Sequence, residues 1–184
     1  MTLSLIQSNC SAINSVYIFE NFLEDLQYLE FLKNKIAKYT STTNKLDYKT
    51  NVLAKMTDWQ HLLKDQDFSR IHDSIGMTLY NVLNLRSPNP NQKRIIQFED
   101  SWGMKHTEGD YTKDHIHGVF HFSGSFYFEV PTITKMWFED YQEETELKDN
   151  MLVIFPGFCK HRVSIHQGKK PRYSMAFNII LREP

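Results

Sequence analysis

The 184-residue sequence has only two cysteines, Cys10 and Cys159, and lacks any long hydrophobic run. Two cysteines so far apart do not form the disulfide framework of a secreted domain, so they favour a reducing compartment. The first 19 residues contain no Lys or Arg, which argues against a signal peptide. The longest apolar stretch, from Met151 to Cys159, is interrupted by Pro156 and Gly157, and a bilayer span needs about 20 residues. The sequence therefore predicts a soluble, cytoplasmic protein that does not bind membranes.

An excess of charge of either sign is also missing, because 21 Lys and Arg stand against 22 Asp and Glu, a formal net charge of -1. This balance gives no general attraction to nucleic acid, which we therefore do not expect as a partner. Aromatic residues, in contrast, are frequent at 14%, as suits a β-rich interior. The length and the hydrophobic fraction of 41% predict a single globular domain, residues 1–184.

The hydrophobic pattern changes near residue 94. Residues 1–93 predict a helical N-terminal layer: a short strand at 16–19, then helices at 22–36, around 58–63 and at 67–85, before a turn at 87–92. Asn21 and Asp58 are the expected N-caps of the first two helices. Residues 94–184 predict antiparallel strands at 95–98, 101–106, 114–120, 124–130, 135–138, 151–155, 161–165 and 172–181. Helices followed by strands indicate an α+β protein with a β-sandwich or closed barrel.

Histidines in the β region give the first chemical signal. His115 and His117 stand two residues apart in the sequence DHIHG. Residues i and i+2 of a strand share a face, so both imidazoles can reach one metal ion. His161 follows the next proline-containing apolar strand. Two solvated surface histidines would give the same short motif, so the pair needs support from the rest of the sequence.

An arginine on the last predicted strand gives the second signal. In RYSMAFN, alternation places Arg172 and Ser174 on one face of a largely apolar strand. A buried charge needs a partner, and a guanidinium matches a carboxylate through two bonds, to which a hydroxyl can add another. A bound ligand or a core Asp or Glu would each supply that carboxylate. Tyr127 shares its face with Ser123 and Ser125, where it either bonds a ligand or fills the barrel.

Several neighbouring side chains are expected to play no part in this site. Asp114 points away from His115 on a regular strand and would reach the metal only from a bulge. Cys159 is expected to be a small buried hydrophobe. We expect Trp102 in the core, His106 and His121 in structural positions, and His166 at an exposed turn.

In this order, the motifs resemble the double-stranded β-helix, the jelly-roll or cupin-like core, of the 2-oxoglutarate- and Fe(II)-dependent oxygenases. More narrowly, they resemble a group of small, mostly uncharacterised bacterial and bacteriophage members of that superfamily. The likeness covers residues 102–178. It consists of the tryptophan strand SWGMKH, then HIHG, the Ser-Gly strand SGSFYFEVP, the strand MLVIFPGFCKHRV, and RYSMAFN.

The resemblance implies that His115, His117 and His161 hold Fe(II). It also implies that Arg172 and Ser174 bind the distal carboxylate of the cosubstrate 2-oxoglutarate, and that O2 is the second cosubstrate. Tyr127, from its position on the strand, is a further candidate for contact with 2-oxoglutarate. The usual second ligand in the superfamily is Asp or Glu, whereas this sequence has His117, as is familiar in the narrower group. A site of three histidines carries one more positive charge than the usual two histidines and one carboxylate.

The implied function is a dioxygenase, most simply a hydroxylase, acting on a small molecule or a protein side chain. Two alternatives stay open. One is a cupin-like metalloprotein that does not use 2-oxoglutarate, and the other is a non-catalytic binding or structural module with the same fold. Arg172 separates them, because neither alternative needs an arginine that faces the barrel interior. The sequence predicts neither the substrate nor the oligomeric state.

Overall fold

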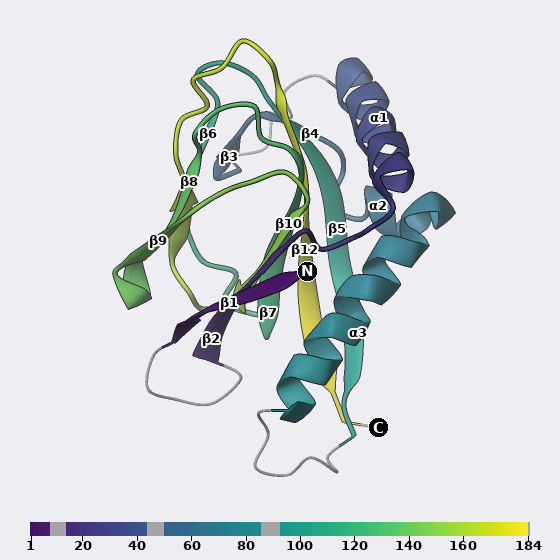
Figure 1. Ribbon diagram of the computed structural model, residues 1–184, viewed down its shortest axis with the longest axis vertical. Helices are drawn as coiled ribbons and strands as arrows, with labels where there is room; N and C mark the ends of the chain where they lie inside the picture. Colours follow the sequence, from purple (N-terminus) through teal and green to yellow (C-terminus); the bar gives the residue numbers. More distant parts are fainter. Residues whose placement is uncertain (8–13, 44–49, 86–92, 184) are drawn as a thin grey trace.

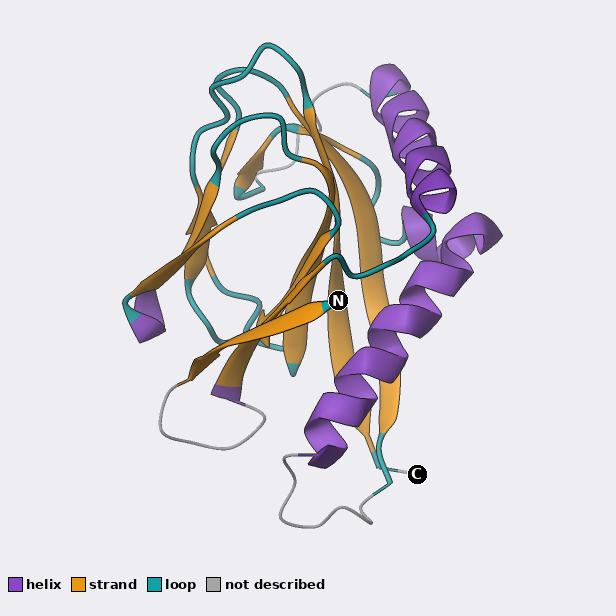
Figure 2. Ribbon diagram, in the orientation of Figure 1, coloured by secondary structure: helices purple, strands orange, loops and turns teal. Residues whose placement is uncertain are grey.

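Two antiparallel sheets face each other, and helices cover the outer face of the larger sheet (Figures 1 and 2). The computed structural model describes residues 1–7, 14–43, 50–85 and 93–183. The expected turn at 87–92 and Cys10 lie outside these ranges. In the described part of the chain, no helix is long and apolar enough to cross a membrane. The two facing antiparallel sheets, with helices on one outer face, confirm the α+β jelly-roll fold predicted from the sequence.

The larger sheet has seven strands in the order β1-β2-β10-β7-β12-β5-β4. Neighbours pair antiparallel throughout, and β12 lies between β7 and β5. The strands are β1 (Thr2–Gln7), β2 (Ser15–Glu20), β4 (Lys55–Met56), β5 (Ile95–His106), β7 (Phe122–Glu129), β10 (Met151–Pro156) and β12 (Arg172–Arg182).

The smaller sheet has five strands in the order β3-β6-β11-β8-β9. A 3-10 turn, Glu139–Tyr141, connects β8 to β9. The strands are β3 (Val52–Leu53), β6 (Tyr111–His115), β8 (Lys135–Phe138), β9 (Glu143–Glu146) and β11 (His161–Val163). Its short central strands β6 and β11 lie opposite the long strands of the larger sheet, with the barrel interior between them.

The helices are α1 (Leu26–Thr42), α2 (His61–Lys64) and α3 (Ser69–Leu85), and a 3-10 turn at Gln66–Phe68 precedes α3. The first helix begins after Asp25, whose carboxylate accepts a hydrogen bond from the Tyr28 amide at 3.0 Å. The prediction that Asn21 caps this helix is wrong. Asn21 has a left-handed φ of 50° and turns the chain before the helix begins.

The second expected cap is also wrong in detail. The N-cap of α2 is Gln60, and Asp58 contributes only its backbone carbonyl, which accepts from the His61 amide at 3.1 Å. The longer helices follow their hydrophobic spacing. In α1, Leu29, Leu32 and Ile36 form the buried stripe, and α3 buries a similar stripe that includes Ile75.

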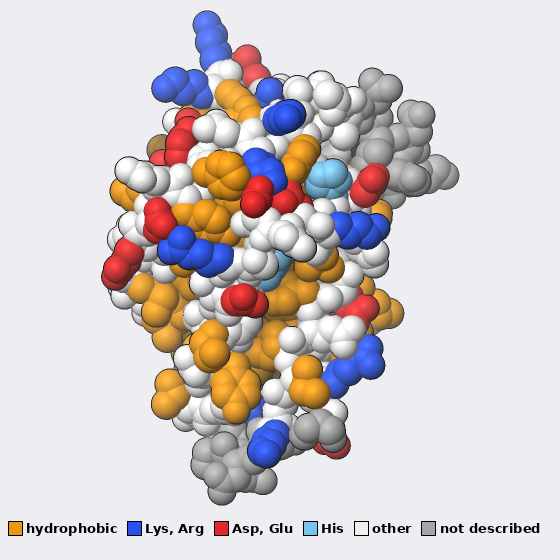
Figure 3. Space-filling model, turned by 90° about the vertical axis from the view of Figure 1, so that its right-hand side faces the viewer, with side chains coloured by type: hydrophobic (Ala, Val, Ile, Leu, Met, Phe, Trp, Pro, Cys, Tyr) orange, Lys and Arg blue, Asp and Glu red, His pale blue; other side chains and the backbone are white. Residues whose placement is uncertain are grey.

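The larger sheet is buried on both faces. On β10, Leu152 and Ile154 belong to the core shared with the helices, whereas Val153 and Phe155 belong to the core between the sheets. Burial on both faces explains why this strand reads as one continuous apolar run instead of an alternation. On the outer helical face, acidic, basic and apolar side chains are interspersed (Figure 3).

The structure corrects several expected strand boundaries. The strands expected at 95–98 and 101–106 form one continuous strand, β5, and the strand expected at 114–120 ends at His115. Four strands were not predicted: β1, β3, β4 and β9. Two of them are only two residues long, and β9 is the acidic sequence EETE, which has no apolar alternation. Strands from residues before 94 join both sheets, so both halves of the chain build the β structure.

Candidate active site

Three histidines meet at the inner surface of the smaller sheet. His115 is the last residue of β6 and His161 is the first of β11, and the two are directly paired across these strands. His117 lies in the turn after β6. Its backbone N–H donates to the Gly157 carbonyl at 2.7 Å, and its carbonyl accepts from the Phe120 amide at 2.9 Å. The sequence therefore places one ligand candidate on each of two strands and a third on a turn tied to the β10–β11 connection.

The prediction that His115 and His117 share a strand face is wrong, because the strand ends between them. They converge because the turn folds back against Gly157. A Cβ atom on Gly157 would lie 2.1 Å from the Phe120 carbonyl oxygen, so only glycine permits this approach. The Pro156-Gly157 pair in the proline-containing motif thus positions His117.

The candidate ligand atoms of His115, His117 and His161 all lie within 4.8 Å of one another. The Nδ1 atoms of His115 and His161 lie 2.8 and 3.0 Å from the carbonyl oxygens of Lys113 and Cys159. Such bonds fix the ring orientation and leave Nε2 free, which is the usual arrangement of a metal-binding histidine.

Burial lowers the pKa of all three imidazoles, to about 3 for His117, and repulsion by His115 adds to the effect on His117 and His161. The three rings are therefore neutral at physiological pH and offer lone pairs. Asp114 is not part of this cluster, because its carboxylate faces outward to Arg162 at 3.3 Å. Cys159 is fully buried and also lies outside the cluster, as expected.

Arg172 and Ser174 lie on the opposite wall, on the inner face of β12. Each is 1% exposed, and Nε and Nη1 of Arg172 and Oγ of Ser174 have no hydrogen-bond partner. Burial lowers the pKa of Arg172, and electrostatic interactions with Tyr127 and Asp110 oppose that shift. Oδ2 of Asp110 already accepts two hydrogen bonds from Thr107, at 2.8 and 2.9 Å.

His106 belongs to the same wall, although the sequence predicts a structural position for it. It is paired directly with Arg172 across β5 and β12, is 1% exposed, and has no hydrogen-bond partner on either ring nitrogen. Burial and the Arg172 charge hold its pKa well below the usual range, so the ring is neutral. The alternation of SWGMKH contained the signal, because His106 shares the strand face of Trp102 and Met104.

These side chains line one internal cavity of about 40 Å³ between the sheets, together with the three histidines and Tyr127. Six buried polar atoms along it have no hydrogen-bond partner: two each of His106 and Arg172, Oγ of Ser174, and Nε1 of Trp102. Buried polar groups are normally satisfied, so such a concentration indicates a place for a ligand. All can donate except one His106 nitrogen, so the ligand is an acceptor, as a carboxylate is.

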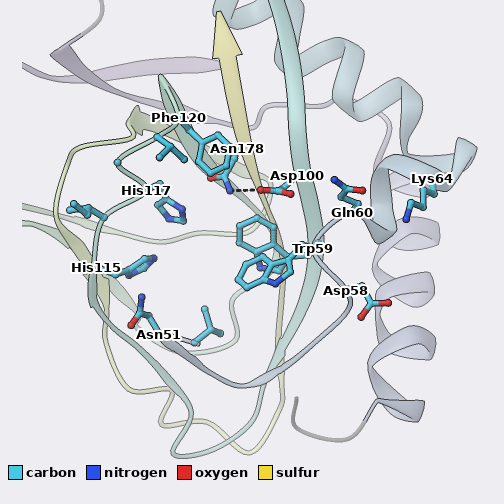
Figure 4. A pocket seen from close by; sticks show the side chains of 15 residues that line it. Asn51, Asp58, Trp59, Gln60, Lys64, Asp100, His115, His117, Phe120 and Asn178 are labelled. Carbon is cyan, nitrogen blue, oxygen red and sulfur yellow. Dashed lines mark hydrogen bonds between the residues drawn. The ribbon is translucent and has the colours of Figure 1, made fainter. Parts of the chain in front are cut away.

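A second, open pocket of about 890 Å³ begins at His115, His117 and Trp102 and extends outward (Figure 4). Pockets of roughly 300–1,000 Å³ are typical of small-molecule sites. The internal cavity holds little more than one end of a ligand, whereas the outer pocket can take a whole side chain or metabolite. His115 and His117 therefore line both the small internal cavity and the large open pocket, and His161 lines the internal cavity.

The other histidines lie away from this cluster. His166 is fully buried, with Nε2 2.7 Å from the Lys170 carbonyl oxygen, so the prediction that it is exposed is wrong. Nδ1 of His121 accepts from the Leu181 amide at 3.3 Å, a structural contact, as predicted. His72 lies on the buried face of α3, with Nε2 2.9 Å from Oγ of Ser101. Tyr127 is 2% exposed in the interior, and its hydroxyl lies 4.0 Å from Sδ of Met136.

Comparison with known proteins finds no matching family model and no matching curated protein sequence. Solved structures do match. A prolyl-4-hydroxylase of Pseudomonas putida superposes with a TM-score of 0.66 at 11% identity, covering 91% of this chain and 92% of the other. The chain has the fold of the 2-oxoglutarate- and Fe(II)-dependent oxygenases. The predicted resemblance to that superfamily is thereby confirmed at the level of fold.

Two further oxygenase structures show the same likeness. The collagen prolyl hydroxylase of Paramecium Bursaria Chlorella virus-1 has a TM-score of 0.62 at 12% identity and covers 89% of this chain and 94% of the other. The epimerase SnoN of nogalamycin biosynthesis, in complex with Fe3+ and α-ketoglutarate, has a TM-score of 0.68 at 11% identity and covers 90% and 78%. Both structures resemble this oxygenase fold over most of its length.

Proposed function

We propose that this oxygenase fold carries an Fe(II)- and 2-oxoglutarate-dependent dioxygenase, most simply a hydroxylase, built from one domain. One observation supports the proposal above all others. Three neutral imidazoles and a buried, unpartnered arginine line the same cavity from opposite sheets. The first group suits a divalent metal ion, and the second suits a carboxylate. A ligand that carries a metal-binding end and a carboxylate end would satisfy both.

His115, His117 and His161 would hold the iron. When bound, iron and 2-oxoglutarate supply the oxidising chemistry, in which O2 is consumed and 2-oxoglutarate is converted to succinate and CO2. Three neutral ligands leave the charge of Fe(II) undiminished, whereas a carboxylate ligand would lower it by one. Among the described residues, no carboxylate joins the three histidines, and Asp114 is turned towards Arg162. The dianionic cosubstrate would therefore be the main source of negative charge at the metal.

Arg172 and Ser174 would bind the far carboxylate of 2-oxoglutarate, with His106 as a third donor and Tyr127 beside them. A charge-assisted hydrogen bond contributes about 1.5–3 kcal/mol, and the planar guanidinium adds geometric selection for a carboxylate. These donors disfavour the binding of apolar molecules, because the polar atoms of the protein would then stay without a hydrogen-bond partner. In the ligand-free protein the chamber is narrow, so side chains must move aside as the cosubstrate enters.

Anaerobic calorimetry and visible absorption with Fe(II) and 2-oxoglutarate test this function. The wild type should bind 2-oxoglutarate only with metal present, and a weak visible charge-transfer band should develop. Arg172→Lys keeps the charge but loses the planar fork, and should weaken 2-oxoglutarate binding about tenfold or more while iron still binds. If the iron-loaded wild type binds no 2-oxoglutarate, or if Arg172→Lys binds it equally well, a cupin-like metalloprotein would be the better assignment.

His106→Phe is a second variant for the same titration. Phenylalanine fills the space of the imidazole but donates no hydrogen bond. We expect roughly five- to tenfold weaker 2-oxoglutarate binding, because a typical hydrogen bond contributes about 1 kcal/mol or slightly more. His72→Phe is the matched control, since His72 is another buried histidine but lies on α3, outside the cavity. Equal loss in both variants would indicate a general structural effect.

A further inference from the structure

The outer pocket suggests which chemical group the substrate carries, an inference that rests on the proposed function. Apart from the histidines, most of the wall nearest the metal site is apolar or aromatic, formed by Trp59, Trp102 and Phe120. Trp59 is 40% exposed although it is a large aromatic residue, and its ring packs edge-on against Trp102 at 4.7 Å between ring centres. Its backbone carbonyl accepts from the Ser101 amide at 2.8 Å, which fixes it beside β5.

Asp100 supplies a carboxylate beside this aromatic wall. It lies on β5 with the alternation of Trp102 and therefore faces the barrel interior. Nδ2 of Asn178 donates to Oδ2 of Asp100 at 3.0 Å (Figure 4), and Ser123 donates to Oδ1 of Asn178 at 2.7 Å. The carboxylate decides which way the amide points, because ionised Asp100 can only accept, so Nδ2 of Asn178 faces it and Oδ1 is left to accept from Ser123.

The Asp100 carboxylate keeps acceptor capacity for a ligand. It can accept about four hydrogen bonds, and Asn178 supplies one. Among the described residues, no Lys, Arg or His forms an ion pair with Asp100. The other charged side chains of the pocket, Asp58 and Lys64, are exposed, and Figure 4 places them on the far side from His115 and His117. Asp100 is therefore the charged side chain of the inner part of this pocket.

From this arrangement we infer that the substrate carries a cationic nitrogen, an ammonium or a guanidinium, which pairs with Asp100 while its apolar portion lies against Trp59. An aromatic face next to a carboxylate attracts a cation through both the ring quadrupole and the charge. The same carboxylate repels acidic substrates.

Four capped amino acids of similar size test the inference: the N-acetyl methylamides of lysine, arginine, norleucine and glutamate. Each offers backbone carbonyl acceptors, and they differ in side-chain charge. Binding is measured by calorimetry and ligand-observed NMR to the full chain, with Fe(II) and 2-oxoglutarate under anaerobic conditions and again without either. The lysine or arginine probe should bind roughly ten- to 150-fold tighter than the norleucine probe, as expected for one charge-assisted hydrogen bond. The glutamate probe should bind weakest.

Asp100→Asn removes the charge, keeps the shape and can still accept from Asn178. It should abolish the preference for cationic probes, whereas metal and 2-oxoglutarate binding stay at wild-type level. Asp58→Asn is the matched control, because it removes the same charge from the exposed rim, and should keep the preference. Absence of binding by both cationic probes, equal binding of the norleucine probe, or a preference that survives Asp100→Asn would each overturn the inference. A wild type that prefers cations but binds no 2-oxoglutarate would overturn the proposed function and not this inference.

Discussion

The substitution Arg172→Met tests whether the buried guanidinium destabilises the ligand-free protein and is needed only to bind a ligand. In the ligand-free protein Arg172 is 1% exposed, and its Nε and Nη1 bond nothing. Leaving a buried charged donor unsatisfied costs about 1–3 kcal/mol or more, and apolar replacement of buried charges is often stabilising by about 1–4 kcal/mol. Methionine follows the same path as the arginine stem and carries no polar donor. We therefore expect the ligand-free variant to be more stable than the wild type by about 1–3 kcal/mol.

The ligand should offset most or all of this difference in stability. For a chain of this size, 1 kcal/mol corresponds to roughly 2–4 °C in Tm, so the ligand-free variant should melt about 2–12 °C higher. At a concentration a hundredfold above its Kd, 2-oxoglutarate should stabilise the metal-loaded wild type by about 2.7 kcal/mol. The variant has lost the carboxylate site and should gain little. The increase in Tm caused by 2-oxoglutarate should thus be large in the wild type and small in Arg172→Met.

Differential scanning calorimetry under anaerobic conditions, with and without 2-oxoglutarate, measures both effects. Arg162→Met is the matched control, because Arg162 is exposed and pairs only at the surface with Asp114. Surface substitutions usually change stability by no more than about 0.5 kcal/mol. A loss of several kcal/mol in ligand-free Arg172→Met would refute the reasoning. It would mean that the guanidinium is satisfied within the protein, with Asp110 as the nearby carboxylate.

Three further predictions concern the metal site, acid stability and packing. Alanine in place of His115, His117 or His161 should sharply lower iron content, measured by elemental analysis, in a protein that stays folded, and unchanged content in all three variants would reject the site. Burial lowers the pKa of His72 to about 4, against about 6.5 when unfolded, so stability should be lost as pH falls from 6.5 to 4, by about 3 kcal/mol at the lower end. His72→Gln should reduce that loss in urea unfolding at pH 7 and pH 4.5; an identical pH dependence in the variant would count against the assignment. In Gly124→Ala the new Cβ would lie 2.4 Å from Cζ of Phe177 and 2.6 Å from the Val153 carbonyl oxygen, so we expect about 2 kcal/mol or more of destabilisation, and wild-type stability would contradict the packing.

The sequence predicted those parts of the fold that depend on local pattern. The strands at 124–130, 135–138, 151–155 and 172–181 and the helix at 67–85 lie within two residues of the observed β7, β8, β10, β12 and α3. Each has a sustained hydrophobic period. Strands β3 and β4 have no such signal, because two residues form a strand only when a neighbouring strand is already present.

For the site, the alternation of side chains along a strand was informative, but the sequence did not show which distant segments would meet there. This alternation placed Arg172 and Ser174 on one interior face, where the structure has them. The same alternation placed His106 on the face of Trp102 and Met104. The sequence does not show, however, whether a histidine at the end of a strand is buried, because that depends on the strand opposite. The convergence of His117 with His115 was predicted for the wrong reason, because it depends on the contact of His117 with Gly157 across 40 residues of chain. Trp59 and Asp100 could not be found, since a pocket wall forms only when distant segments meet.

The two ends of the proposed cosubstrate site stand on different sheets. The histidines belong to β6, β11 and the turn after β6, whereas Arg172 and Ser174 belong to β12, and interior side chains such as Met136 and Phe155 separate the two walls. The spacing between the walls therefore limits the length of the ligand, and apolar residues that line the cavity without bonding the ligand help to set it. Dicarboxylates one carbon shorter or longer should be discriminated by that spacing. Changing the size of Met136 is then a way to retune which acid fits, without altering a single ligand-binding group.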